Sequence, residues 1–369
     1  GSLGLKAVKE KGGLVIAQEP DEAGYDGMPR SAIGTGAVDL VLPLTKIPDA
    51  LVNHRRGAAV KRTQGDSRPD DRSADRLSGI IELLRAKTAH DFSLYKRDAL
   101  ERRIERRMAM VGIEADDTAR YLEILRSDPD EIKRLAKDML ISVTSFFHDP
   151  KVFDLLAESI IPDLVANRKP EQPVRIWVAG CGTGEETYSL AMLFHEQIAA
   201  SKHDIKLQVF ASDVDPDAVA LARNGLYPVT IEADVSAARL ARFFSREEHG
   251  YRVLPELRET VVFTVQDVLA DPPFSRLDLV SCRNLLIYLR PEAQAKIIAL
   301  FDFALREGGV LLLGNAETIG DAESRFKVIS EPERLYRHIG RGRPGEVDFS
   351  LQAGDGVREP PHSEQRQTL

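Results

Sequence analysis

The stretch from Arg175 to Glu186, Arg-Ile-Trp-Val-Ala-Gly-Cys-Gly-Thr-Gly-Glu-Glu, constrains the fold of this chain more than any other. It consists of a short apolar run of strand type, a turn in which Gly180, Gly182 and Gly184 alternate with other residues, and the start of a helical pattern. Glycine lets the backbone turn tightly and lets a ligand approach the main chain. This order of elements predicts an open α/β sheet with a nucleotide-sized crevice at the carboxyl ends of its strands.

The residues after the turn distinguish between two kinds of cofactor. A dinucleotide site has its third glycine five positions after the first, where the pyrophosphate rests on the helix N-terminus. In this chain that position is Glu185, and Glu186 follows it. Two carboxylates repel a diphosphate but attract an amino group. S-adenosylmethionine carries an ammonium group and no phosphate, so it is the cofactor that this turn favours.

Composition and charge limit the class of protein. With 369 residues, 43% of them hydrophobic, the chain can form the cores of two or more domains. A net charge of −8 argues against a nucleic-acid partner and against attraction to an anionic membrane. The two cysteines, Cys181 and Cys282, cannot form a disulfide framework, which fits a reduced compartment. Without a long apolar run or signal peptide, we expect a cytoplasmic protein that is not inserted in a membrane. We also expect no metal site.

The pattern along the chain predicts five segments. Residues 1–52 carry two short apolar runs and make a poor independent core. Residues 53–76 are charged, with few large apolar side chains, and are predicted to be a linker. Helical periodicity covers residues 77–168, strands alternate with helices over residues 169–340, and residues 341–369 are polar and predicted to be disordered.

The strands of the fourth segment predict the fold class, α/β with a mostly parallel, Rossmann-like sheet. The expected strands cover residues 175–179, 207–211, 261–265, 277–282 and 309–313. Two further runs, Phe326–Ile329 and Leu335–Ile339, predict an antiparallel hairpin that closes the sheet.

Acidic residues follow successive strands, where such a sheet binds its ligand. Asp213 ends the second strand and suits two ribose hydroxyls, and Asp267 follows the third, where it can accept from an adenine amino group. The fourth strand ends at Arg283 and Asn284, with Tyr288 four residues further on. A single acid at a strand end is usually a helix cap or a surface charge. Acids after several strands in turn favour a nucleoside cofactor, while Tyr288 fits either the site or the core.

One motif points elsewhere and one helix has two interpretations. Asp271–Phe274 spells Asp-Pro-Pro-Phe, which DNA amino-methyltransferases use to hold a flipped base, but here it precedes its strand, so DNA methylation is disfavoured.

A helix with an apolar stripe through Leu100, Ile104, Met108 and Val111 also carries four arginines off that stripe. The arginines form either a solvated face or a docking surface for an acidic partner. They are Arg102, Arg103, Arg106 and Arg107.

Four spaced motifs resemble the chemotaxis receptor glutamate O-methyltransferases of the CheR type. They are Ser-Val-Thr-Ser-Phe-Phe (142–147), Gly-Thr-Gly-Glu-Glu-Thr-Tyr-Ser (182–189), Ala-Ser-Asp-Val-Asp (211–215) and Cys-Arg-Asn-Leu-Leu-Ile-Tyr (282–288). The resemblance extends over about residues 77–340. Before it, residues 26–43 resemble the C-terminal end of chemotaxis protein-glutamate methylesterases. In that family the catalytic triad lies upstream of this segment, so no esterase residue carries over.

The resemblance implies a helical receptor-docking domain, an S-adenosylmethionine domain and a small β-subdomain inserted at about residues 226–259. The implied cofactor contacts are Thr144, Glu185, Asp213, Asp267, Arg283 and Asn284, and Ser142, His148, Gly180 and Val268 complete the candidate set. This chain departs from the family twice, with His148 in place of an arginine and Thr187 in place of a proline.

The implied reaction is methylation of glutamate side chains on the cytoplasmic helical bundle of a chemoreceptor, with S-adenosylhomocysteine as the second product. A glutamate is already ionised at neutral pH, so the reaction needs no general base. Tyr288 and His148 are the candidate residues beside the transferred methyl group, and the four arginines are the candidate receptor contacts. The alternatives are a non-catalytic scaffold that binds the cofactor and an enzyme that methylates a small molecule.

Overall fold

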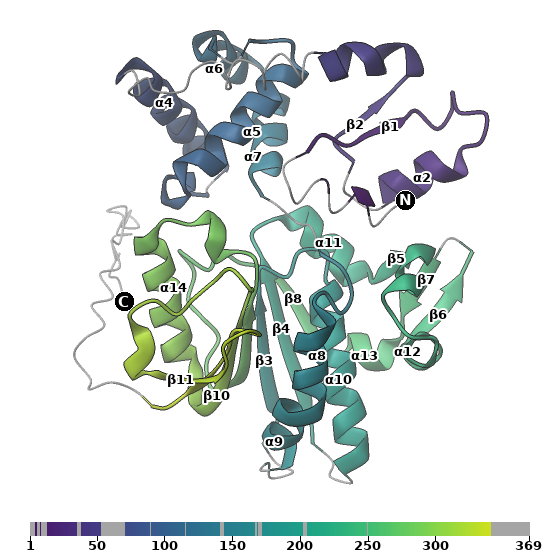
Figure 1. Cartoon of the computed structure of the whole chain (residues 1–369), viewed down its shortest axis with the longest axis vertical. Helices are drawn as coiled ribbons and strands as arrows, with labels where there is room; N and C mark the ends of the chain where they lie inside the picture. Colours follow the sequence, from purple (N-terminus) through teal and green to yellow (C-terminus); the bar gives the residue numbers. More distant parts are fainter. Residues whose placement is uncertain are drawn as a thin grey trace, which may run out of the picture.

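The computed structural model shows a helical domain above an α/β domain, with the N-terminal segment beside the helical domain (Figure 1). It describes residues 4–5, 8, 13–34, 38–52, 71–88, 90–114, 116–140, 144–166, 168, 172–201, 205–248 and 250–340. Most of the expected linker and the whole of the expected C-terminal tail lie outside the described residues.

The α/β domain is built on a seven-stranded sheet with the order β11-β12-β10-β9-β3-β4-β8. The strands are β3 (Val174–Ala179), β4 (Leu207–Asp213), β8 (Val261–Val265), β9 (Leu277–Cys282), β10 (Leu305–Leu313), β11 (Phe326–Ser330) and β12 (Leu335–His338). Strands β8, β4, β3, β9 and β10 pair in parallel, and β12 pairs antiparallel with both β10 and β11. The predicted mostly parallel sheet and its closing hairpin are confirmed.

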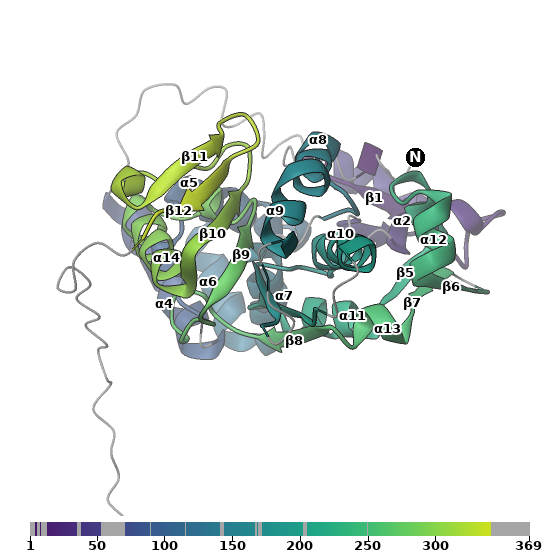
Figure 2. The ribbon, with the colours of Figure 1, turned by 90° about the horizontal axis from the view of Figure 1, so that it is seen from below.

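Helices cover both faces of the sheet (Figure 2). Alternate residues of β3 point to opposite faces, so Ile176 joins one buried cluster and Trp177 the other. On the first face lie α8 (Pro150–Leu155), α9 (Ile161–Ala166), α10 (Glu185–Ser201) and α11 (Pro216–Asn224), and on the second lies α14 (Pro291–Ala304). We expected residues 150–166 in the helical domain. They pack on the sheet instead, because Phe153 and Leu156 bury their apolar side chains there.

In the part of the helical domain that the structure describes there are four α-helices: α4 (Asp71–Thr88), α5 (Arg97–Met110), α6 (Thr118–Ser127) and α7 (Pro129–Met139). Helix α4 begins six residues before the expected start at 77, inside the expected linker. Leu100, Ile104 and Met108 of α5 are buried, as the apolar stripe predicts. Val111 does not belong to this stripe, because it caps the C-terminus of α5 and is 37% exposed.

A three-stranded antiparallel sheet lies at the side of the α/β domain, within the expected insertion. It consists of β5 (Leu226–Pro228), β6 (Phe244–Glu247) and β7 (Gly250–Val253), with α12 (Ala237–Phe243) and α13 (Pro255–Arg258) beside it. A Cβ atom at Gly250 of β7 would lie 2.1 Å from the Tyr227 carbonyl oxygen of β5, so only glycine lets β5 and β7 pair here. Phe146 packs edge-on against Tyr227 and Phe244, which joins the segment before α8 to this β-subdomain.

The N-terminal segment forms a two-stranded parallel sheet from β1 (Ile16–Gln18) and β2 (Leu40–Leu42), with α2 (Gly27–Gly34) between them. Asp39, just before β2, forms an ion pair with Arg106 of α5 and so ties this segment to the helical domain.

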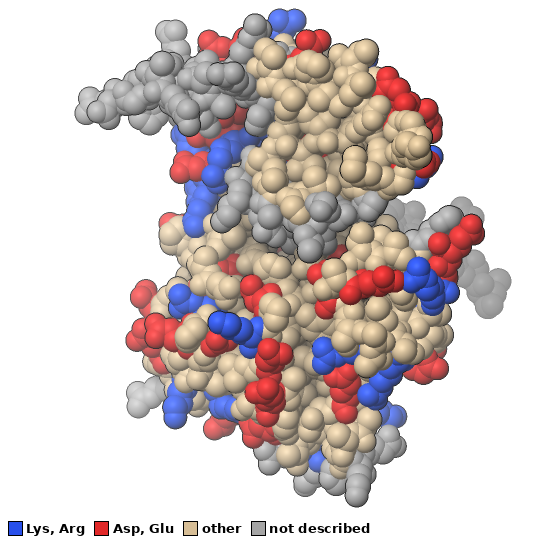
Figure 3. Space-filling view, turned by 45° about the vertical axis from the view of Figure 1, so that its right-hand side comes forward, with Lys and Arg blue, Asp and Glu red and all other residues tan. Residues whose placement is uncertain are grey.

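No helix within the described residues is long and apolar enough to cross a membrane. On the face in Figure 3, acidic and basic side chains intermix over the α/β domain and form no single-sign surface.

Candidate cofactor and substrate site

A cavity of about 650 Å³ lies where the helical domain meets the carboxyl ends of the sheet strands. Its walls come from the glycine turn, from the ends of β4, β8 and β9, from α5 and from the segments around residues 90 and 148. The lining includes twelve of the residues predicted from the sequence: Arg102, Arg103, Arg106, Thr144, His148, Gly180, Asp213, Asp267, Val268, Arg283, Asn284 and Tyr288. Ser142 lies outside the described residues.

The glycine turn adopts a shape that other residues cannot easily form. Gly180 and Gly184 have φ values of 74° and 97°, in the left-handed region. A Cβ atom at Gly184 would also lie 2.9 Å from both Ala222 Cβ and Tyr227 Oη. The N–H of Gly182 donates to Asp213 Oδ2 at 2.8 Å, so the acid at the end of β4 holds the turn in place.

Asp213 is held by backbone donors. Its other oxygen, Oδ1, accepts from the N–H of Asp215 at 2.9 Å. Burial raises the pKa of Asp213, and these backbone hydrogen bonds oppose the rise. Among the described residues Asp213 takes part in no ion pair. Each oxygen has a further lone pair, so the carboxylate can still accept hydrogen bonds from a ligand in the cavity.

Asp267, after β8, is bound by a residue that the sequence did not reveal. Its Oδ1 accepts from the N–H of Leu269 at 2.8 Å, and its Oδ2 lies 2.8 Å from Nδ1 of His90. The Asp-Pro-Pro-Phe motif has a structural part here, because Asp271 accepts from the N–H of Asp267 and Phe274 stacks on Phe210 against the core. It does not line the cavity.

Of the two acids that begin α10, Glu186 lines the cavity and Glu185 does not. Glu185 is 9% exposed and accepts from the hydroxyl of Thr183 at 2.6 Å. Glu186 accepts from Ser281 Oγ at 2.6 Å and pairs with Arg283 at 3.2 Å. Consecutive residues of a helix point about 100° apart, so only one of the two can face the ligand. The structure therefore places Glu186, and not Glu185, on the cavity wall.

Arg283 is a buried link between three parts of the site. Its side chain is 2% exposed and pairs with Asp149 as well as with Glu186. It also donates to the carbonyl oxygen of His148 at 3.1 Å. The turn that it holds contains Phe147 and Asp149, both with positive φ. Because two carboxylates already compensate its charge, Arg283 orients Glu186 and His148 more than it attracts a ligand.

Glu317 shapes the turn after β9 and was not found from the sequence. It is 3% exposed, and its carboxylate accepts from the N–H groups of Gly314, Asn284 and Ile287 at 2.7, 3.1 and 3.2 Å. Burial raises the pKa of Glu317, and the backbone donors oppose that rise. Asn284 has a φ of 60°, so this carboxylate stabilises the unusual backbone that carries Tyr288 beyond it.

Arginines of α5 form the wall opposite the strand ends. Arg102, Arg103 and Arg106 all line the cavity. The guanidinium of Arg103 lies 5.7 Å from the ring centre of Tyr288, which places that tyrosine at the cavity wall. The cavity therefore has two sides of opposite charge. Three acids at the strand ends and helix start, Glu186, Asp213 and Asp267, face three arginines of the helical domain.

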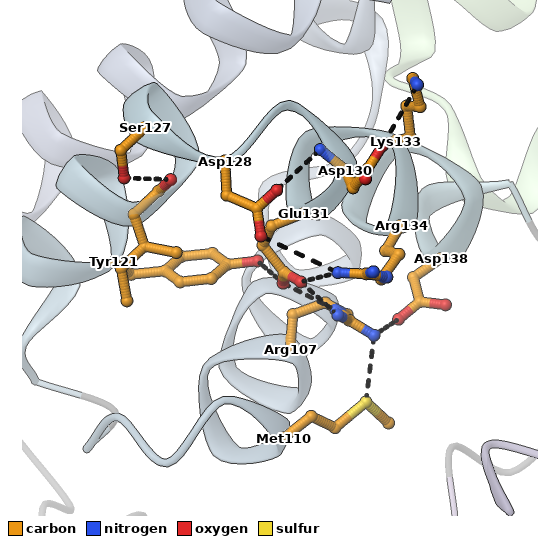
Figure 4. Close-up of polar contacts among 11 residues, drawn as sticks. Arg107, Met110, Tyr121, Ser127, Asp128, Asp130, Glu131, Lys133, Arg134 and Asp138 are labelled. Atoms are coloured by element: carbon orange, nitrogen blue, oxygen red, sulfur yellow. Dashed lines mark hydrogen bonds and ion pairs between the residues drawn. The ribbon is translucent and has the colours of Figure 1, made fainter.

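Arg107 does not belong to this cationic wall. Figure 4 shows it between Glu131 and Asp138 of α7, with Tyr121 of α6 also directed at Glu131. Its Nη2 lies 2.6 Å from Glu131, whose side chain is only 2% exposed. The Tyr121 hydroxyl donates to the same carboxylate at 3.0 Å. Arg107 therefore joins helices α5, α6 and α7 and is not free to dock a partner, contrary to our expectation for all four arginines.

The residues present fit S-adenosylmethionine. A cavity of about 650 Å³ is in the range of small-molecule sites, and backbone at Gly180 and Gly182 is open to a ligand. Acceptors dominate the strand-end wall, and the ribose hydroxyls, the adenine amino group and the ammonium group are all donors. Among the described residues, no group of three or more His, Cys, Asp or Glu is placed to hold a metal ion.

The sheet order, the glycine turn and the strand-end acids define the class of protein, a Rossmann-like S-adenosylmethionine-dependent methyltransferase. The chain belongs to the CheR methyltransferase family. The S-adenosylmethionine-binding domain of that family matches residues 142–335 and its all-alpha domain matches residues 75–140. Residues 1–51 match the CheB methylesterase family, as the sequence predicted.

Named relatives agree with this assignment. The chemotaxis protein methyltransferase of Escherichia coli is 30% identical over 67% of this chain and 85% of its own length. That of Listeria monocytogenes is 30% identical over 62% of this chain and 84% of its own. An uncharacterized 104.1 kDa protein of Rhodobacter capsulatus is 39% identical over 94% of this chain, which spans only 38% of that protein.

Proposed function

We propose that this chain transfers a methyl group from S-adenosylmethionine to glutamate side chains on the cytoplasmic helical bundle of a chemoreceptor. The products are glutamate methyl esters and S-adenosylhomocysteine. The division of the cavity into an acidic and a cationic side carries this proposal. The acidic side suits a positively charged cofactor, and the arginines of α5 suit a negatively charged substrate side chain.

The strand-end residues hold the cofactor. Asp213 accepts from the ribose hydroxyls, Asp267 from the adenine amino group and Glu186 from the ammonium group. The lining of the same cavity also includes Thr144, Gly180 and Val268. When bound, S-adenosylmethionine supplies a methyl group attached to a positively charged sulfur.

The helical domain presents the substrate. Arg102 and Arg103 attract a receptor glutamate and orient its carboxylate toward the cofactor side, whereas Arg106, on the same wall, already pairs with Asp39. Because the carboxylate is already ionised at neutral pH, no residue of this chain has to remove a proton. Tyr288, beside Arg103, and His148 both line the cavity and exclude water from the carboxylate, which makes it more reactive.

The decisive experiment is transfer of a radiolabelled methyl group to the purified cytoplasmic domain of a candidate chemoreceptor, followed by mild base. Glutamate methyl esters release the label in base, and methylated nitrogen retains it. We expect base-labile label on the receptor and none with glutamine in place of its methylated glutamates. Base-stable label would contradict the proposed substrate. Binding of S-adenosylhomocysteine without transfer to any candidate receptor would favour the scaffold.

A further inference from the structure

A chain of three polar side chains crosses the contact between the helical domain and the end of β8. His90 lies between the other two, with Nδ1 at 2.8 Å from Asp267 Oδ2 and Nε2 at 3.1 Å from Tyr95 Oη. His90 is 6% exposed and Tyr95 is also 6% exposed, yet both line the cofactor cavity. Neither His90 nor Tyr95 has a part in the methyl transfer proposed above.

The direction of each hydrogen bond follows from the protonation states. Burial alone would raise the pKa of Asp267, but its contacts, first among them the hydrogen bond from His90, outweigh it, and the net shift is downward. An ionised Asp267 only accepts, so Nδ1 of His90 carries a hydrogen. Burial, reinforced by the charges of Asp267 and Asp213, raises the pKa of Tyr95. Tyr95 therefore keeps its proton, and when His90 is neutral with its hydrogen on Nδ1, the Tyr95 hydroxyl donates to Nε2.

The backbone fixes these side chains in place. The N–H of Lys96 donates to the Tyr288 carbonyl at 2.8 Å, and the N–H of Arg290 donates to the Leu94 carbonyl at 2.9 Å. Tyr95 pairs with Leu289 between these two bonds. The segment that carries Tyr95 is thus tied to the turn after β9, and the His90 imidazole is held by its own two contacts, to Asp267 and to Tyr95.

A second acceptor lies beside Asp267. The side-chain amide of Gln266 donates from Nε2 to the Pro272 carbonyl at 2.7 Å, which fixes the direction of its other end. Its Oε1 is buried and has no hydrogen-bond partner among the described residues. Both Gln266 and Asp267 line the cavity, so this wall offers acceptors to a ligand that brings donors.

We propose that His90 and Tyr95 are positioning residues, which hold Asp267 as a fixed acceptor for the 6-amino group of the purine base. The helical domain thereby takes part in the choice of cofactor as well as in receptor docking. A 6-oxo purine would place a carbonyl oxygen against this acceptor and leave it unpaired. The inference rests on the proposed placement of the base at Asp267.

Calorimetry with two ligands tests this proposal: S-adenosylhomocysteine and S-inosylhomocysteine, its 6-oxo analogue. We expect the wild-type chain to prefer the adenine ligand by at least about tenfold, the equivalent of about 1.4 kcal/mol. In His90→Asn the amide nitrogen is the same number of bonds from Cβ as Nδ1 of the histidine, so it can still donate to Asp267. This variant should retain most of the preference for the adenine ligand. His90→Gln moves the nitrogen to the Nε2 position, so the preference should fall about tenfold, toward parity.

Two further variants separate positioning from general stability. Lys96→Ala removes a bond from Nζ to the Ile287 carbonyl in the same domain contact without touching Asp267, and it should leave the preference unchanged. Tyr95→Phe removes only the donor to His90 and should reduce the preference less than His90→Gln does. Thermal melting identifies variants that do not fold. If His90→Gln does not fold, Tyr95→Phe tests the positioning role instead, by the ratio of its affinities for S-adenosylhomocysteine and S-inosylhomocysteine.

The outcomes distinguish this inference from the proposed function. A wild-type preference that His90→Gln or, failing that, Tyr95→Phe leaves unchanged would overturn the positioning role, even with receptor methylation intact. The absence of a preference in the wild-type chain would overturn it as well. Loss of receptor methylation with the pattern of ligand preferences as expected would instead count against the proposed substrate only.

Discussion

Replacing Asp213 with alanine tests whether the acid at the end of β4 binds the cofactor. Each of its oxygens accepts one backbone N–H, from Gly182 at 2.8 Å and from Asp215 at 2.9 Å, which leaves lone pairs for the ligand. A hydrogen bond to a charged group contributes about 1.5–3 kcal/mol. The dissociation constant of S-adenosylhomocysteine should therefore rise roughly 10- to 150-fold.

The structure favours the upper part of this range. Alanine also removes the acceptor of the Gly182 N–H, and Gly182 lines the same cavity. The ligand then loses its own bond and also part of the shape of the turn. We expect a cost of about 2–3 kcal/mol.

Calorimetry at constant salt measures this cost, and Asp217→Ala is the matched control. It removes the same charge four residues further on, from a side chain that is 69% exposed and paired with Lys137. A surface charge of this kind should change affinity little. An unchanged dissociation constant in Asp213→Ala would refute the assignment. Equal weakening in both variants would mean that the effect is one of net charge and not of contact.

Three further predictions concern stability and the remaining site residues. Glu131→Gln should destabilise the fold by about 3 kcal/mol in urea unfolding, because Arg107 keeps Asp138 at 3.6 Å but loses its main partner; a loss below about 1 kcal/mol would contradict this. Burial lowers the pKa of His195 in the folded chain. As the pH falls through about 6.5, this histidine therefore binds a proton more readily in the unfolded chain than in the folded one, and the free energy of unfolding should decrease. Urea unfolding at several pH values should show a smaller decrease in stability for His195→Gln than for the wild-type chain. Identical pH profiles for the two proteins would contradict this prediction. His148→Ala should weaken cofactor binding by about tenfold or less, since a neutral hydrogen bond contributes about 0.5–1.5 kcal/mol, without abolishing methyl transfer. A loss of turnover by several orders of magnitude would give His148 a chemical role.

The strand-end acids could be predicted because their positions depend on the sheet alone. The carboxyl ends of parallel strands meet at one edge, so Asp213 and Asp267 had to lie near the glycine turn. Which of Glu185 and Glu186 lines the cavity depends on the direction in which the first turn of α10 faces. The sequence predicts the start of a helix only to within a residue or two, and a shift of one residue exchanges the two side chains.

Contacts between domains could not be predicted in this way. His90 and Asp267 are 177 residues apart, and nothing in their local sequence indicates that one faces the other. Their contact depends on how the helical domain docks on the sheet. Arg107 and Glu131 belong to different helices, and their pairing depends on the rotation of α5 against α7. Periodicity identified the buried stripe of α5, but it could not say which polar side chains would find partners.

The opposite charges across the cavity follow from the position of α5. Ile104 and its apolar neighbours fix one side of this helix in the helical core, and Arg107 fixes a second side through Glu131. Arg103 donates to the Asp138 carbonyl oxygen of α7, and its guanidinium also lies beside the Tyr288 ring at the cavity wall. Arg106, on the same helix, faces both the cavity and Asp39 of the N-terminal segment. The cationic wall is thus a consequence of helix packing, and the acidic wall is a consequence of sheet topology. The two walls are held against each other by the bonds between residues 94–96 and 288–290, together with the His90–Asp267 and Lys137–Asp217 contacts.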